Sequence, residues 1–311
     1  MRSGARIQPD PAAALSNAVA TLIQRASKHA DQLHRDDVAA VHEFRKAVRR
    51  ARGLVSFARD LCEPAGHAEV AAILREAFRS TGALRDSAVR LELLDELHHA
   101  AALDPLGRSV REALSSELPT RERAALVLTA AAQAVAAALP SFQSSLDPNL
   151  DMDRLEGALE RANRRVRRAF RRAFESGEDE AFHDWRKRLK DWRAIHDVID
   201  DWGECGPLGE RRELAAMTQR FGALTDLILL QRTVQERSER HSTGPLLRTI
   251  QRRIDARKRF LLSWGARRHA AAPARVAARL RGALEATWRG RERKSASGPI
   301  RRSRRLPEGA P

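Results

Sequence analysis

The sequence predicts an all-α protein built from two similar helical bundles. Alanine, leucine, arginine and glutamate dominate its 311 residues, β-branched and aromatic residues are sparse, and tyrosine is absent. That composition favours helices over strands. Apolar residues also recur at helical spacing along most of the chain. Finally, a stretch around residue 42 is repeated around residue 183, which indicates that one helical unit is used twice.

Breaker residues divide the chain into successive helical segments. In the first half we expect helices over residues 11–33, 38–61, 68–102, 106–117 and 120–139, separated by Glu63-Pro64-Ala65-Gly66, Asp104-Pro105 and Leu118-Pro119. In the second half we expect helices over residues 151–176, 179–202, 207–239, 244–265 and 273–291, with breaks at Gly203, Gly206-Pro207, Gly244-Pro245 and Pro273.

The same breakers suggest the domain organisation. Residues 140–150, which contain Pro140 and Pro148, are the expected linker between a first half over 12–139 and a second half over 151–292. Residues 1–11 form a short N-terminal extension. Residues 293–311 are rich in Gly, Pro, Ser and Arg and lack apolar periodicity, so we expect a disordered basic tail there.

Two pairs of matching segments indicate the internal repeat. Residues 41–49 (VHEFRKAVR) match residues 182–190 (FHDWRKRLK), with their histidines 141 residues apart. Residues 74–86 (LREAFRSTGALRD) resemble residues 214–226 (LAAMTQRFGALTD), with Gly82 and Gly222 140 residues apart. Two matches in the same order at nearly equal offset predict two bundles related by pseudo-two-fold symmetry, with a groove or pore where they meet.

The charge balance points to an anionic partner. Lys plus Arg number 57 against 41 Asp plus Glu, a formal net charge of +16, which attracts polyanions over a long range. Nucleic acid, anionic lipid and polyphosphate are the candidates, and the predominance of arginine favours bidentate binding of phosphate. We expect no membrane span, because no stretch approaches roughly 20 apolar residues, and no signal peptide, so we expect a cytoplasmic protein.

Both repeated segments fit the pattern H-x-x-R-K-x-x-[RK]-x-x-R. These positions fall within about 120° of a helix circumference, so each helix carries a basic stripe on one face. Beside each stripe runs an apolar seam that should face the core. The stripes are the candidate polyphosphate-binding residues, namely His42, Arg45, Lys46, Arg49 and Arg52 in the first copy and His183, Arg186, Lys187, Lys190 and Arg193 in the second.

A stripe that borders the core can line a groove where charges are less screened by water. Like charges three or four residues apart destabilise a helix, so either a bound polyanion or buried carboxylates should compensate them. Asp86, preceded by Arg85, and Asp226 follow the repeated glycines and are candidate orienting partners. A solvated helix face is the alternative explanation for any one basic stripe, but repetition of the same spacing disfavours it.

A further basic segment precedes the second stripe. Residues 161–172 contain seven arginines and no acid, and if this helix packs antiparallel to the stripe, the two would wall one basic groove. The comparable helix of the first half is less basic. The secondary candidates for binding are Arg25, Lys28, Arg161, Arg164, Arg165, Arg168, Arg171 and Arg172.

The doubled H-x-x-R-K-x-x-[RK] helices and the L-x(7)-G-x-x-x-D segments that follow them resemble the CHAD domain, the conserved-histidine α-helical domain, over about residues 12–291. The resemblance implies two four-helix bundles with pseudo-two-fold symmetry, a basic central pore or pocket, binding of inorganic polyphosphate and association with polyphosphate granules. By the same resemblance, the ten stripe residues are implied to bind polyphosphate. The second copy has Thr225 where the first has Arg85, which departs from the pattern.

Catalysis and nucleic-acid binding are the alternatives to polyphosphate binding. No Walker loop, G-x-G-x-x-G, H-E-x-x-H or paired-carboxylate signature occurs, so we expect no enzymatic activity, no cofactor and no metal. A phosphohistidine at His42 or His183 is the remaining chemical alternative. Binding of RNA or DNA is the main alternative, but the aromatic residues Phe44, Trp185 and Trp192 fall on apolar seams, which leaves no platform for stacking bases.

Overall fold

The computed structural model describes residues 10–32, 37–82, 84, 120–202, 208–236 and 244–296. Within these ranges the regular elements are helices, as the sequence predicts. They are α1 (Pro11–Asp31), α2 (Asp37–Phe57), the short 3-10 helix η1 (Ala58–Leu61), α3 (Pro64–Ser80), α6 (Arg121–Ala137), α7 (Leu139–Ser145), α8 (Met152–Ser176), α9 (Asp179–Trp202), α10 (Leu208–Glu236), α11 (Gly244–Arg268) and α12 (Pro273–Ala296).

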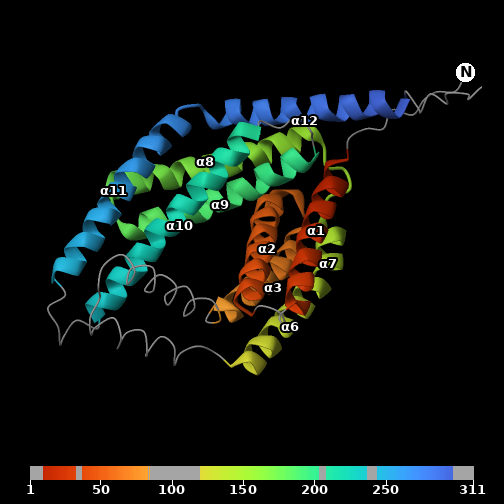
Figure 1. Ribbon diagram of the computed structural model, residues 1–311. Helices are drawn as coiled ribbons and strands as arrows, with labels where there is room; N and C mark the ends of the chain where they lie inside the picture. Colours follow the sequence, from red (N-terminus) through yellow and green to blue (C-terminus); the bar gives the residue numbers. More distant parts are fainter. Residues whose placement is uncertain are drawn as a thin grey trace, which may run out of the picture.

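Each half contains four helices that contact one another in a ring. In the first half, α1 and α3 both contact α2 and α6. In the second half, α9 and α11 both contact α8 and α10. The rings are joined where α2 contacts α9, and α12 lies along α8 on the outside of the second ring (Figure 1). The two helical bundles are therefore present, and the pseudo-two-fold relation between them stays a prediction.

Capping residues fix where the helices that matter for the site begin and end. The side chain of Asp151 accepts a hydrogen bond from the backbone N–H of Arg154 and so caps α8. Gly177 ends α8 with a φ of 67°, a left-handed conformation that glycine adopts without strain. That reversal returns the chain directly into α9, which packs against α8.

Three element boundaries differ from expectation. The helix expected from residue 68 begins at Pro64, because the Glu63 carboxylate accepts hydrogen bonds from the N–H groups of Ala65 and Gly66 and caps it. The expected linker 140–150 contains most of α7, since a proline in the first turn of a helix sacrifices no hydrogen bond. α12 continues to Ala296, past the expected start of the tail. The expected helix 106–117 lies outside the described residues.

One described stretch, Arg121–Ser145 across α6 and α7, is long and apolar enough to cross a membrane by length and composition alone. A single such helix is weak evidence for a span, so the described residues show no clear membrane-spanning segment. Leu128, Ala131 and Val135 of α6 are nevertheless buried in the core, and α6 packs against α1 and α3. The stretch therefore includes a core helix of the first bundle.

Candidate anion-binding site

Burial of the apolar seams sets the direction in which both basic stripes point. The seams comprise Val41, Phe44, Val48 and Ala51 on α2 and Phe182, Trp185, Leu189 and Trp192 on α9, and every one of these residues is buried. Trp185 packs edge-on against Phe221 of α10, with ring centroids 4.8 Å apart. Because the seams are anchored, the adjoining stripes lie at the border between core and solvent, as the sequence predicts.

α2 and α9 approach each other closely at Gly53. A β-carbon added at Gly53 would lie only 3.3 Å from the Cα atom of Asp191 and 3.4 Å from Cβ of Ala194. Any larger side chain would hold the two helices apart. The glycine therefore allows the stripe of α2 to lie next to the stripe of α9.

Arg49 of α2 interacts across this contact with Arg186 and Lys190 of α9. Together with their stripe neighbours they form what we call the crossing cluster: Arg45, Arg49 and Arg52 of α2 with Arg186, Lys190 and Arg193 of α9. Burial lowers the pKa of Arg49 to about 10, and repulsion by Arg186 and by its stripe neighbours adds to this. Burial likewise lowers the pKa of Lys190 to about 6, assisted by Arg186 and Arg49. The two stripes are thus coupled across the interface between the halves.

Phe78 of α3 supports the α2 side of the cluster. Its ring centroid lies 4.1 Å from Cζ of Arg45, 4.5 Å from that of Arg49 and 5.0 Å from that of Arg52. Arg45 also donates to the backbone carbonyl of Phe78 at 2.7 Å and to the hydroxyl of Thr81 at 3.1 Å. Phe78 and Thr81 both fall inside the repeated segment 74–86, but its sequence did not predict their contact with the stripe.

Carboxylates lie at the edges of the crossing cluster. Burial raises the pKa of Asp191, while the cations Arg188, Arg49 and Arg52 oppose that rise. Asp226 of α10 exerts a favourable charge interaction on Arg186 and Lys190, and its orienting role stays a prediction. Arg85 and Asp86 lie outside the described residues.

Asp197 forms a buried clamp at one end of the cluster. Its carboxylate lies 3.1 Å from Nη2 of Arg50 on α2 and 3.1 Å from Nε of Arg211 on α10, and 3.8 Å from Nε of Arg193. The side chain is buried, so these charges are only partly screened. One residue thereby links three helices from both halves, a role that the sequence did not reveal.

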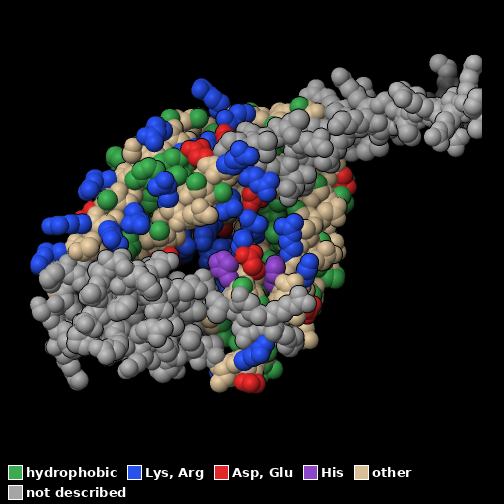
Figure 2. Space-filling view, viewed as in Figure 1, with side chains coloured by type: hydrophobic (Ala, Val, Ile, Leu, Met, Phe, Trp, Pro, Cys, Tyr) green, Lys and Arg blue, Asp and Glu red, His purple; other side chains and the backbone are tan. Residues whose placement is uncertain are grey.

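The remaining stripe residues lie toward the rim. His42, Lys46 and Lys187 are exposed, and His183 is half-buried, which lowers its pKa. Nζ of Lys46 lies 2.9 Å from the Glu43 carboxylate, and Nζ of Lys187 lies 3.5 Å from that of Asp184. Figure 2 shows a hollow between the two groups of helices, with Lys and Arg side chains in it and histidine and acidic side chains at its edge.

The arginines of α8 do not join the crossing cluster. Arg161 pairs with Asp60 at 2.8 Å, Arg164 pairs with Glu160 on its own helix, and Arg172 lies 3.3 Å from Asp184 near the rim. Arg165 is half-buried, with Arg188 and Asp191 among its neighbouring charges. Arg168 and Arg171, like Arg25 and Lys28 of α1, are exposed. That these arginines of α8, with Arg25 and Lys28 of α1, contribute to binding stays a prediction.

The repeated glycines occupy matching surroundings in the two halves. A β-carbon added at Gly82 would lie 3.7 Å from Nη1 of Arg45, and one added at Gly222 would lie 3.7 Å from Nη2 of Arg186. Each glycine therefore lies beside the first arginine of its stripe. Within the described residues, no group of three or more His, Cys, Asp or Glu side chains is arranged to hold a metal ion.

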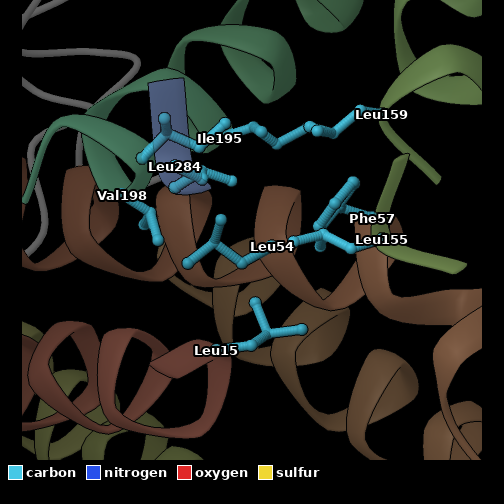
Figure 3. Close-up of a pocket in the computed structure, with 9 residues that line it drawn as sticks. Leu15, Leu54, Phe57, Leu155, Leu159, Ile195, Val198 and Leu284 are labelled. Atoms are coloured by element: carbon cyan, nitrogen blue, oxygen red, sulfur yellow. The ribbon is translucent and has the colours of Figure 1, made fainter. Parts of the chain in front are cut away.

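An apolar contact region beside the crossing cluster is filled by side chains of the protein. Side chains from α1, α2, α8, α9 and α12 converge there (Figure 3). The free volume among them is about 10 Å³, close to that of a single water probe. The contact region includes Leu15, Leu54, Phe57, Leu155, Leu159, Ile195, Val198 and Leu284. It is a packed contact between the two halves and has no room for a ligand.

Comparison with known proteins supports the resemblance seen in the sequence. The crystal structure of the CHAD domain from the plant Ricinus communis is similar, with a TM-score of 0.56 and 17% identity over 88% of this chain and 91% of that one. PptA from Streptomyces chartreusis is similar as well, with a TM-score of 0.57 and 17% identity over 93% of this chain and 100% of that one. No curated protein matches the sequence significantly. The CHAD domain profile matches residues 17–201, more than half of the chain, so the protein belongs to the CHAD domain family.

Proposed function

We propose that the protein binds inorganic polyphosphate at the crossing cluster, in a basic groove between its two helical bundles. The observation that carries this proposal is the convergence of two stripes, one from each half, at a single helix contact. Membership of a family associated with polyphosphate supports it.

The energetics of the empty site favour a polyanion. Burial lowers the pKa of Lys190 to about 6, and repulsion by Arg186, Arg49 and Arg193 adds to this because burial also weakens screening by water. A chain of phosphates would supply negative charge along the whole length of the cluster. Guanidinium groups can hold phosphate oxygens through paired, charge-assisted hydrogen bonds, each contributing about 1.5 to 3 kcal/mol.

The alternative ligand is RNA or DNA, which presents phosphates as well. Proteins that bind single strands usually offer exposed aromatic rings on which bases stack. Phe44, Trp185 and Trp192 of the stripe helices are buried instead, and the Phe78 ring is already covered by guanidinium groups. A ligand made of phosphate without bases fits this cluster better.

We also propose that binding involves no chemical turnover and that the protein acts in the cytoplasm, on polyphosphate granules. The cations of the site account for the chemistry of both stripes through binding alone, with His42 and His183 as rim residues that donate to phosphate.

A competition titration tests the proposal. Long-chain polyphosphate, RNA and DNA are titrated into the protein at equal phosphate concentration and fixed physiological salt, since affinity for polyanions depends steeply on salt. We expect polyphosphate to bind more tightly than either nucleic acid. We also expect saturating polyphosphate to raise the melting temperature, because a ligand of the folded state stabilises it. Equal or tighter binding of RNA would contradict the proposal.

A further inference from the structure

Three successive arginines of the first stripe share a single aromatic support. Arg45, Arg49 and Arg52 project from α2, and the Cζ atoms of all three lie within 5.0 Å of the ring centroid of Phe78 on α3. Guanidinium groups at such distances are attracted by the negative faces of an aromatic ring. The ring therefore draws together three like charges that would otherwise repel one another.

The chemistry of this support matters for anion binding. A carboxylate that orients an arginine also neutralises part of its charge and competes with a bound anion. An aromatic ring orients the guanidinium without itself neutralising the charge, so that Asp191 is left as the carboxylate that interacts with Arg49 and Arg52. The other contacts of Arg45 described above, to the Phe78 carbonyl and the Thr81 hydroxyl, are neutral in the same way.

The second half uses a different support at the matching place. The position 140 residues after Phe78 is Thr218, and Nη1 of Arg193 donates to its hydroxyl at 2.9 Å. Arg193, the counterpart of Arg52, also lies 3.8 Å from the buried carboxylate of Asp197. The two stripes are therefore held by different means, although their sequences match.

We propose that Phe78 is a positioning residue that holds Arg45, Arg49 and Arg52 as a preordered row for successive phosphates. This inference rests on the proposed function, because it explains how one wall of the groove binds. Preordering removes the cost of immobilising long, flexible side chains when the ligand arrives. The α2 stripe should consequently contribute more binding energy than the α9 stripe.

The test compares Phe78 variants that retain all the cations. Titration of long-chain polyphosphate into folded Phe78→Leu and Phe78→Met should show affinity lowered by about fivefold or more, as expected when ring–cation contacts are lost. Phe78→Tyr, which keeps the aromatic face, should bind like the wild type. Phe260→Leu is the matched control, because its ring supports Arg220 at 4.4 Å outside the crossing cluster. That variant should bind within about twofold of the wild type.

A second measurement keeps a folding defect separate from a positioning effect. Circular dichroism establishes that each variant is folded at the temperature of titration, and NMR of the arginine Nε–H groups reports ring-current shifts that Phe78→Leu should remove. Unchanged affinity in folded Phe78→Leu, or Phe78→Tyr as weak as Phe78→Leu, would overturn the inference. Those outcomes leave polyphosphate binding by the wild type intact, whereas failure of the wild type to bind would overturn the proposed function itself.

Discussion

At the scale of single residues, Lys190 is the group whose charge depends most on what occupies the site. Burial lowers its pKa to about 6, with Arg186, Arg49 and Arg193 adding repulsion and Asp226 opposing it. Its amine is therefore largely neutral at pH 7.5 when the site is empty. Bound phosphate would favour the ammonium form and raise the pKa.

Binding of polyphosphate at pH 7.5 should consequently take up a proton at Lys190. Calorimetric titration in buffers with different ionisation enthalpies measures this uptake directly. Lys190→Arg is the control, because a guanidinium stays charged and should take up fewer protons. Affinity of the wild type should also fall more steeply than that of Lys190→Arg as pH rises above about 6. Proton uptake that is equal in the two proteins would contradict this assignment.

The same lowered pKa predicts how Lys190 affects stability without ligand. The unfolded chain binds a proton at the ordinary pKa of 10.5, whereas the folded protein binds it only near pH 6. The contribution of Lys190 therefore becomes less favourable as pH falls from about 10.5 to about 6. Lys190→Met should raise the free energy of unfolding at pH 7, measured by urea denaturation, while it weakens polyphosphate binding. A destabilised Lys190→Met protein would contradict this expectation.

The sequence predicts the stripe residues but not the side chains that contact them in the folded protein. The spacing of histidine, arginine and lysine is local, so it can be read within one helix turn after another. Phe78 and Asp197 act through helices that meet only in the folded protein. One signal for Phe78 was present: the repeated segments differ there, with Thr218 in the second copy.

At the scale of helices, the contact between α2 and α9 depends on the absence of a side chain at Gly53. Gly53→Val would place new atoms against the backbone of Asp191 and the side chain of Ala194. Overpacking of this kind costs about 1 to 3 kcal/mol, and separating the helices should also weaken polyphosphate binding. Urea denaturation and titration measure the two effects.

Gly282→Val on α12 is the matched control for Gly53→Val. A β-carbon added at Gly282 meets no atom within 4 Å, so this change should alter stability by less than about 0.5 kcal/mol. Similar stability and affinity for the two valine variants would show that close approach of α2 and α9 is not required.

Helix positions were largely predictable because turn residues and caps act locally. The predicted segments 151–176 and 179–202 agree with α8 and α9 to within a residue. Two of the three differences lie at prolines: Pro64 and Pro140 resemble breakers in the sequence, whereas each lies in the first turn of a helix. A proline alone does not distinguish the start of a helix from a loop.

At the scale of the whole molecule, Asp197 of α9 joins the two halves through Arg50 of α2, and it also pairs with Arg211 of α10 within its own half. Asp197→Ala would leave these arginines without their buried partner, and because both are partly exposed we expect a loss of about 2 kcal/mol. Asp153→Ala is the control, since that carboxylate is 79% exposed and its solvated pairing with Arg281 should contribute much less to stability. Chemical denaturation measures both variants, and an equal loss of unfolding free energy in Asp197→Ala and Asp153→Ala would show that Asp197 does not join the halves.

The joining of the halves was less predictable than either half. The repeat at an offset of about 140 residues predicted two similar bundles and a site between them. It did not predict the ring of contacts within each bundle, the position of α12 along α8 or the buried clamp. These features depend on tertiary packing between segments far apart in the sequence.

The central claim is that the two stripes bind polyphosphate together through oriented contacts, beyond the attraction of net charge. The direct measurement is the polyphosphate affinity of two double variants. One carries both Arg49→Ala and Arg186→Ala, and the control carries both Arg121→Ala and Arg123→Ala, which are exposed positions on α6. Each double variant lacks two positive charges. The crossing variant should lose about 1.5 to 3 kcal/mol of binding free energy per removed contact and keep its melting temperature, because like charges are removed. Equal affinities of the two folded variants for polyphosphate would contradict the claim.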